Sequence, residues 1–306
     1  MLKYIGQRIL IGVFSLFVLI TVAFFLTRKM PGSPFQTGSV ADEVLHSIEA
    51  RYGLDQPVIN QYQTYLGNIL HGDFGESLRK PGVTVSAVII RAWPVTAVIG
   101  SLAVVLAMVL GTLLGIWQAS THHRFVKKGI FLGTILGTGI PNFIIALMLV
   151  LVFGVKLKWL PTSGLNGPQN YILPVISLAV YPTAVVSRLM NNTFSWEMKQ
   201  DYVVMARAKG LHQNTIGVFH ILKNAWIPVL NYIGPAAAFL LTGSFVVESI
   251  FTIPGLGREF VTSIVNRDYT VILGLTVFMG MVVILINLLV DVLCAWLDPR
   301  IRRWQP

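Results

Sequence analysis

The sequence predicts an all-α integral membrane protein that crosses a bilayer about six times. Of its 306 residues, 54% are apolar and only 12% are charged, whereas soluble domains are about half apolar and a quarter charged. An uncharged apolar run of about 18 residues or more is long enough to cross a hydrocarbon core about 30 Å thick. Residues 172–187 form the weakest of the candidate runs, because that run ends early, at Arg188. The candidate runs are residues 9–27, 95–123, 129–155, 172–187, 225–247 and 269–290.

The first run is expected to be an uncleaved span. It follows Lys3 and Arg8, as the apolar part of a signal peptide would, but Arg28-Lys29-Met30-Pro31 comes after it in place of a small-residue cleavage site. The polar residues 31–93 are long enough to fold outside the bilayer. Within them, Pro57 precedes apolar residues at helical spacing up to Gly72, which predicts a helix, and residues 42–52 form a weaker helix candidate.

Small residues recur in the second and third runs. Gly111 and Gly115 in the second, and Gly129, Gly133 and Gly137 in the third, are spaced four apart. In lipid, such residues let helix backbones approach closely, so a tightly packed bundle is expected. Pro141-Asn142 then interrupts the third run, which predicts a kink with unpaired backbone groups. If that backbone lines a cavity, Asn142 would face a transported solute.

The net charge of +10 is best explained by membrane topology. The basic residues stand singly beside apolar runs and do not form the basic and aromatic clusters of a nucleic-acid interface. With both termini in the cytoplasm, more than half of the 23 Lys and Arg residues lie on the cytoplasmic side, as the positive-inside rule requires. These are Lys3, Arg8, Arg124, Lys127, Lys128, Arg188, Lys199, Arg207, Lys209, Lys223, Arg300, Arg302 and Arg303.

The longest segment on that side, residues 191–226, contains two amphipathic runs. The first begins at Asp201 and ends at Gly210, a favoured C-terminal residue of helices. The second covers residues 215–222 and leads into Asn224 and Pro228. Two short helices at the membrane face would suit docking onto another protein, and an interfacial helix that touches only lipid headgroups is the equal alternative.

Polar and charged residues inside the runs are candidates for function, because burying a charge in hydrocarbon costs at least about 2.5 kcal/mol. For Glu248 we favour a structural hydrogen bond to the turn at residues 254–257 over contact with cargo. For Asp291 we favour an ion pair with Arg188 or a loop lysine over proton transfer. The candidates for a translocation path or gate are Asn142, Arg188, Glu248, Asn287 and Asp291.

Residues 201–211 carry an Ala-x-Ala-x-Gly core, and Val204 or Met205 stands where an acidic residue would precede it. With His220, Asn224 and Pro228, this loop resembles the EAA loop of ATP-binding cassette (ABC) importer permeases of the peptide and nickel branch. In that family the loop is the coupling helix, which sits in a cleft of an ATPase subunit. The resemblance assigns the coupling role to Ala206, Ala208, Lys209, Gly210, Leu211, His220, Asn224 and Pro228.

Further motifs extend the resemblance over the whole chain, and their shared order is similar to the B-type subunits, the oligopeptide members above all. They begin at Met30, Tyr52, Gly72, Leu160, Glu248, Arg267 and Asp298. The resemblance implies a type I importer permease fold, with residues 1–93 as a first span plus external segment and residues 94–306 as the permease domain with its coupling loop at 191–226.

The resemblance also implies a pore-forming subunit of the bacterial inner membrane that imports oligopeptides. Its partners would be a homologous C-type permease, two ATPase subunits and an external peptide-binding protein. No phosphate-binding loop of the Gly-x-x-x-x-Gly-Lys-Ser/Thr type occurs in the sequence, so ATP and magnesium are expected in partner subunits and no cofactor or catalytic residue in this chain.

Several alternatives stay open. Dipeptide, glutathione or nickel cargo fits the same motifs. An ion-driven secondary transporter is less favoured, because it would need several intramembrane carboxylates or symmetric broken helices. A membrane hydrolase is disfavoured, because Ser163 and His122-His123 are expected on opposite faces of the membrane.

Overall fold

The computed structural model describes residues 2–30, 53 and 55–297. The helix candidate at 42–52 and the motifs at 31–34 and 298–302 lie outside these residues. The described part is helical and contains no strand, only an isolated antiparallel bridge between Glu76 and Thr84. The expected all-α class is therefore confirmed.

Among the described residues, five helices are long and apolar enough to cross a membrane, and a bent pair makes a sixth span when it is counted as one. The five spanning helices are α1 (Leu2–Arg28), α4 (Val85–Ser120), α7 (Ile172–Glu197), α10 (Leu222–Thr242, continued by α11) and α13 (Tyr269–Leu297). The bent pair consists of α5 (Arg124–Gly139) and α6 (Asn142–Leu149), the latter extended by the π-helix η1 (Val150–Lys156). The shorter helices are α3 (Val58–Leu70), η2 (Pro168–Tyr171), α8 (Asp201–Ala208), α9 (Gln213–Thr215), η3 (Ile216–Ile221), α11 (Phe245–Ile250) and α12 (Leu256–Val265).

Two expectations about the spans are corrected. Helix α7 does not stop at Arg188 but continues to Glu197, because a charged side chain on an exposed face does not interrupt the backbone hydrogen bonds of the helix. The run at 215–222 is not a separate short helix, because α9 and the π-helix η3 pass directly into α10. Helix α3, in contrast, begins after Pro57 as predicted and is closed by Gly72, whose φ of +77° suits glycine.

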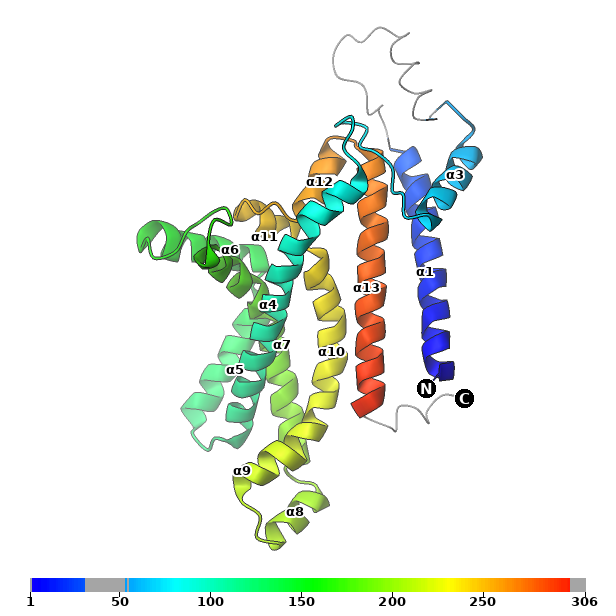
Figure 1. The fold of residues 1–306 in the computed structure, drawn as a ribbon. Helices are drawn as coiled ribbons and strands as arrows, with labels where there is room; N and C mark the ends of the chain where they lie inside the picture. The colour runs from blue at the N-terminus through cyan, green and yellow to red at the C-terminus, as the bar shows by residue number, and fades with distance from the viewer. Residues whose placement is uncertain (1, 31–52, 54, 298–306) are drawn as a thin grey trace.

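The expected break at Pro141 is confirmed, and it is sharper than a kink. The axes of α5 and of α6 with η1 differ by 106°. Pro141 precedes Asn142 as the N-cap residue of α6, so it opens a new helix in a different direction. Figure 1 shows α6 turned across the end of the bundle near α11.

The packing of α4 against α7 depends on glycine, as the small-residue pattern predicts. A Cβ atom on Gly111 would lie 2.7 Å from Val186, and one on Gly115 would lie 2.6 Å from the side chain of Met190. Gly137 of α5 approaches Ala184 in the same way, at 2.9 Å. Gly129 and Gly133 do not follow the prediction, because nothing lies within 4 Å of a Cβ there. They line an apolar cavity of about 590 Å³ between α4, α5 and α7.

Helix α1 stands at the edge of the bundle and packs on α13. A Cβ on Gly12 would lie 2.7 Å from Ile284, and one on Gly280 would lie 2.4 Å from Leu19, so the two helices are in close contact. Arg8 of α1 forms an ion pair with Asp291 of α13 at 3.1 Å. Asp291 thus has a basic partner as expected, but the partner is Arg8 and not Arg188 or a loop lysine.

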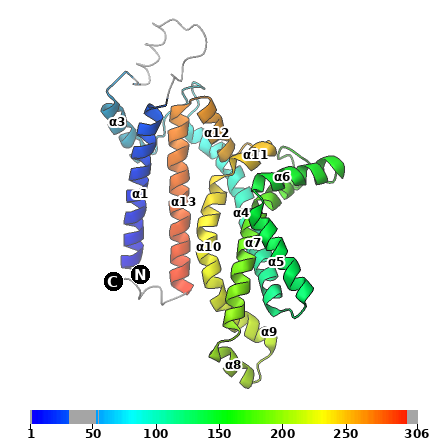
Figure 2. The ribbon, with the colours of Figure 1, turned by 180° about the vertical axis from the view of Figure 1, so that it is seen from behind.

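The two ends of the bundle differ. Figures 1 and 2 agree that the start of α1, the end of α13 and helices α8 and α9 lie at one end, whereas α3, α11 and α12 lie at the other. We call the first the α8 end and the second the α12 end. At the α12 end, the buried carboxylate of Asp268 accepts hydrogen bonds from the Ser77 hydroxyl and from the Leu78 N–H, the latter at 3.1 Å. Two motifs separated by 190 residues in the chain are therefore joined directly.

Candidate functional site

Helix α8 projects from the α8 end of the bundle and carries the loop motif. Its C-terminus is closed by two hydrogen bonds, from Gly210 N to Arg207 O at 2.9 Å and from Leu211 N to Ala206 O at 3.3 Å. This is the Schellman arrangement, which needs a left-handed residue, and Gly210 has φ of +76°. The motif glycine is therefore explained by local geometry.

One face of α8 is anchored in the protein and the other is free. Val203 and Ala206 are buried in an apolar cluster with residues of α7, η3 and α10, Phe194 and Ile216 among them. The exposed face carries Ala208, Lys209, Gly210 and Leu211. Ala206 thus packs inward on its own chain, whereas residues 208–211 are accessible to another protein, as are Val204 and Met205, which are 57% and 60% exposed. The buried face therefore joins α8 to α7 and α10.

Tyr202 connects α8 to both spans that flank it. Its hydroxyl donates a hydrogen bond to the Glu197 carboxylate at the end of α7 and accepts one from Asn224 Nδ2 of α10 at 3.2 Å. The same hydroxyl lies 3.5 Å from the carbonyl oxygen of His220. Burial, followed by the hydrogen bond to Glu197, raises the pKa of Tyr202 to about 12. The phenol therefore stays protonated at neutral pH, which is the state that donates.

A second contact joins α7 to α10 directly. The hydroxyl of Thr193 lies 3.0 Å from the carbonyl oxygen of Ala225, one residue beyond Asn224. Pro228 follows inside α10, where it has no N–H to donate to the helix. The predicted loop residues His220, Asn224 and Pro228 therefore lie at the root of the loop, where it enters the bundle.

A cavity of about 350 Å³ opens where α5 and α6 meet, against α7 and α10. Its polar side chains are Thr138, Asn142, Tyr181 and Tyr232, and the broken backbone at 139–141 forms part of its wall. Asn142 is therefore the one predicted path residue that lines this cavity. Half-buried Asn142 and exposed Tyr181 offer hydrogen-bonding groups among apolar side chains, a combination that is typical of small-molecule sites.

Arg188 lies on the same face of α7 as Tyr181. The two residues are seven apart, which corresponds to nearly two turns and about 10 Å along the helix. Both are exposed, and the described residues include no carboxylate within ion-pair distance of Arg188. An arginine in a membrane span with no carboxylate partner among the described residues is a candidate for contact with cargo or with another subunit.

Glu248 has a structural position at the α12 end. It is 3% exposed, and its carboxyl accepts hydrogen bonds from Thr96 Oγ1 at 3.0 Å and from Arg258 N at 2.9 Å. Thr96 Oγ1 in turn accepts from Leu256 N at 2.8 Å. The carboxyl therefore holds the turn at 254–257 against α4, which is the structural role favoured from the sequence.

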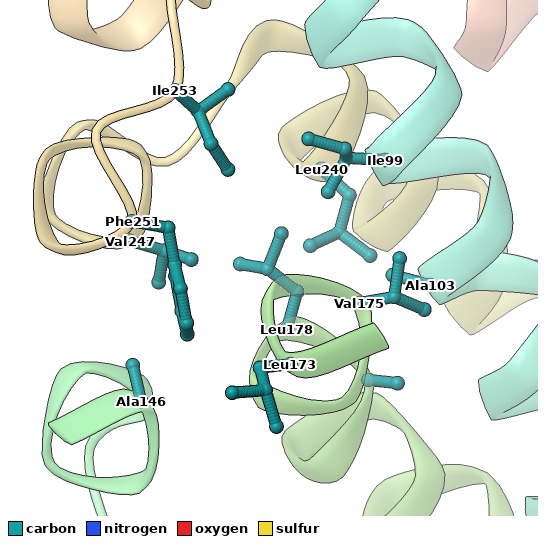
Figure 3. Packing of buried hydrophobic residues seen from close by; sticks show 11 residues of the cluster. Ile99, Ala103, Ala146, Leu173, Val175, Leu178, Leu240, Val247, Phe251 and Ile253 are labelled. Carbon is teal, nitrogen blue, oxygen red and sulfur yellow. The ribbon is translucent and has the colours of Figure 1, made fainter. Parts of the chain in front are cut away.

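The surroundings of Glu248 are closely packed. A Cβ on Gly243 or Gly255 would lie 2.7 or 2.6 Å from its carboxyl group. Figure 3 shows Phe251 and Ile253, next to this turn, in one apolar cluster with residues of α4, α6, α7 and α10. Neither Glu248 nor Asn287 nor Asp291 lines the cavity at the break.

The sequence did not identify Tyr202, Glu197, Tyr181 or Tyr232 as functional. Tyr202 and Glu197 are five residues apart on two helices joined by a turn, so no helical spacing places them together. Tyr181 directly precedes Pro182, and Tyr232 lies three residues before Pro235, both prolines lying inside the spans. The prolines near the middle of three spans are the sequence feature from which a cavity could have been predicted.

Comparison with protein families gives two matches that together cover most of the chain. The model of binding-protein-dependent transport system inner membrane components matches residues 111–303. The model of the N-terminal part of such membrane components matches residues 1–99.

Curated relatives are similar over their full lengths. The oligopeptide transport system permease protein OppB of Haemophilus influenzae is 40% identical over 305 residues, which cover 99% of this chain and 100% of that protein. The dipeptide transport system permease protein DppB of Bacillus subtilis is 40% identical over 303 residues, covering 99% and 98%. OppB of Salmonella typhimurium is 40% identical over 306 residues, covering 99% and 100%.

Solved structures show a related fold. The inward-facing MetNI methionine ABC transporter matches with a TM-score of 0.57 at 17% identity, covering 69% of this chain and 96% of the matched chain. An amino acid ABC transporter crystallised with histidines matches with a TM-score of 0.50 at 17% identity, covering 70% and 94%. This similarity confirms the fold class expected from the sequence.

Proposed function

Because this chain belongs to the family of binding-protein-dependent transport system inner membrane components, we propose that it is the pore-forming permease subunit of an ATP-driven importer of short peptides. The observation that carries the proposal is the 40% identity to OppB and DppB proteins over 99% of the chain. Since both oligopeptide and dipeptide permeases are equally similar, the proposed cargo class is the short peptide.

The proposed complex contains a second, homologous permease, two ATPase subunits and an external peptide-binding protein. ATP and magnesium belong to the ATPase subunits, and this chain contributes no catalytic residue. Both termini and α8 are proposed to lie in the cytoplasm. Arg124, Lys127, Lys128, Arg207 and Lys209 belong to loops or helix ends that would then meet the cytoplasm, which agrees with the positive-inside rule.

The exposed face of α8 is proposed to sit in a cleft of an ATPase subunit. Ala208 has a small side chain and Gly210 has none, so a partner surface can approach the backbone there. Lys209 supplies one positive charge. When the ATPase subunits close, the movement would pass from α8 through Tyr202 to Glu197 and Asn224, and thus to α7 and α10 together. Those two helices form walls of the cavity at the break, so a rigid displacement of α8 would change the cavity's access.

The face of α7 that carries Tyr181 and Arg188 is proposed to border the translocation path between the two permeases. A peptide in the path brings a terminal carboxylate, for which Arg188 offers a fork of N–H donors. Asn142 and Tyr181 would bond to backbone amides, which are common to all peptides and carry no sequence information. Such contacts fit a channel that accepts many peptides.

Reconstitution in liposomes tests this function. The chain is co-expressed with its proposed partners, purified with them, and assayed for ATP hydrolysis and for uptake of radiolabelled di- to pentapeptides. The proposal requires ATP hydrolysis that rises when peptide and binding protein are added together, with uptake that depends on ATP. Uptake driven by a proton or sodium gradient in the absence of ATP would contradict it and would favour a secondary transporter.

A further inference from the structure

Helix α3 is an uncharged helix that the described part of the chain leaves largely uncovered. Its residues, Val58–Leu70, include no Asp, Glu, Lys or Arg, and none of them is buried. Val58, Ile59 and Leu70 are 44%, 54% and 86% exposed. Burying each such side chain is worth roughly 1.5–3 kcal/mol, so a helix of this composition is expected to have a covering environment.

The position of α3 indicates the depth of that environment. The Tyr62 hydroxyl lies 2.7 Å from Thr21 Oγ1 of the first span. Thr21 is seven residues before Arg28, where that span ends, which is about 10 Å along the helix axis. Figures 1 and 2 both show α3 beside the last part of α1 and not beyond it. The helix therefore lies at the level of the membrane boundary.

Aromatic contacts fix which face of α3 meets α1. The ring of Phe24 lies 5.3 Å from that of Tyr62 and 5.8 Å from that of Tyr65, and the ring of Phe25 lies 5.5 Å from that of Tyr62. At 100° per residue, Ile59, Leu66 and Leu70 lie side by side next to this tyrosine face. We call these three residues the α3 stripe. Exposed Gln63 lies beside Leu70 at the edge of the stripe, Asn60 lies about 100° from Ile59, and Thr64 and Asn68 lie on the opposite side of the helix.

The α3 stripe continues a surface that faces lipid. Next to the tyrosines, α1 exposes Val22, Phe25 and Leu26, which are 50%, 38% and 61% exposed inside a membrane span. Phe25 touches both surfaces, because its ring packs on Tyr62 and is itself partly exposed. The apolar surface thus passes without a charged side chain from α1 to α3.

We propose that α3 is a membrane-interface helix whose stripe of Ile59, Leu66 and Leu70 inserts among the phospholipid acyl chains of the leaflet at the Arg28 end of α1. Its tyrosines lie at the headgroup level, where amphipathic aromatic rings are enriched, and Asn60, Thr64 and Asn68 face water. An uncharged polar face makes this contact independent of anionic lipid, unlike the Lys- and Arg-rich helices that bind by charge. Only the naming of this leaflet as the outer one rests on the proposed topology.

Spin labelling in proteoliposomes tests the proposal. Single cysteines replace Ile59 or Leu70 on the stripe and, as matched controls on the same helix, Asn60 or Thr64, all in a Cys294→Ala background. After nitroxide labelling and reconstitution of the full chain with its partners in phosphatidylcholine vesicles, collision rates with oxygen and with a water-soluble nickel chelate are measured. Oxygen concentrates in the acyl region and the chelate in water.

The proposal expects the ratio of oxygen to chelate collisions to be several-fold higher at 59 and 70 than at 60 and 64. Equal ratios at all four positions, with free access of the chelate, would place the stripe in water and overturn the proposal. Low collision rates with both reagents at 59 and 70 would also overturn it, because they would show that another protein covers the stripe. Replacing a fifth of the lipid by anionic phosphatidylglycerol should leave the ratios unchanged.

Discussion

The Tyr202 hydroxyl donates a hydrogen bond to the Glu197 carboxylate, so helix α8 is attached to the end of the span that precedes it. The same hydroxyl accepts from Asn224 of the following span. One side chain of the loop thus contacts both helices that would have to move together if the loop couples ATP hydrolysis to transport.

Tyr202→Phe removes this connection with little change of shape. Each such hydrogen bond contributes about 0.5–1.5 kcal/mol, so we expect a folded protein in which fewer peptides are transported per ATP hydrolysed, by several-fold. The measurement is the ratio of uptake to ATP hydrolysis in proteoliposomes. Tyr171→Phe, near the α12 end, is the control and should leave the ratio unchanged. An unaltered ratio in Tyr202→Phe would show that the phenol does not transmit movement.

The contribution of Tyr202 should not depend on pH in the neutral range. The pKa of Tyr202 is raised from 10.0 to about 12, and a raised pKa means that the folded state favours the protonated phenol. The resulting stabilisation is complete below pH about 10 and is lost as the pH rises through about 12. Comparing thermal unfolding of wild type and Tyr202→Phe from pH 6 to 11 tests this. Their difference should be constant to pH 9 and shrink above pH 10, and a difference that vanished between pH 6 and 8 would contradict the assignment.

Glu248→Gln should destabilise the protein. The carboxyl accepts from Thr96 and from Arg258 N, whereas the glutamine amide would direct N–H groups at one of these donors in a buried site. A loss of about 1–3 kcal/mol is expected, seen as a lower unfolding temperature in detergent. Glu259→Gln is the matched control, because Glu259 forms an exposed ion pair with Arg91 at 3.4 Å, and such pairs contribute about 0–1 kcal/mol. Equal effects of the two changes would argue against the structural role of Glu248.

The proposed topology predicts which reagents reach each end of the bundle. In a Cys294→Ala background, a cysteine at exposed Thr64 should react with a membrane-impermeant maleimide in intact spheroplasts. A cysteine at exposed Lys209 should react only in inverted vesicles. The reverse pattern would invert the topology, and with it the assignment of α8 to the cytoplasm.

The sequence predicts elements best where one residue type fixes the local geometry. Pro57 and Gly72 set the ends of α3, Gly210 closes α8, and Pro141 breaks the third span. Each of these effects is local, so the neighbouring sequence is sufficient to predict it.

Predictions that depended on distant partners were less complete. The rule that a charge ends a span made the predicted fourth span shorter than α7. The sequence does not reveal that Arg188 faces away from the bundle core. Asp291 has its basic partner in Arg8, 283 positions away in the chain, on a helix whose position the sequence does not give. Gly129 and Gly133 have the same spacing as Gly137, but only Gly137 meets a neighbouring helix. Contacts between spans follow from the arrangement of the bundle, which spacing within one span does not determine.

Substitution of Gly210 tests the central claim, that the exposed end of α8 docks on an ATPase subunit. Asp and Asn have nearly the same shape and both tolerate the left-handed conformation, and no atom lies within 4 Å of a Cβ at Gly210, so Gly210→Asp and Gly210→Asn differ mainly in charge. The measurement is the amount of ATPase subunit that co-purifies with each variant, together with peptide uptake at equal membrane levels of the chain. The account predicts that Gly210→Asp loses at least ten-fold in both quantities while Gly210→Asn keeps a large share of them. Full ATPase binding and uptake by Gly210→Asp would contradict it.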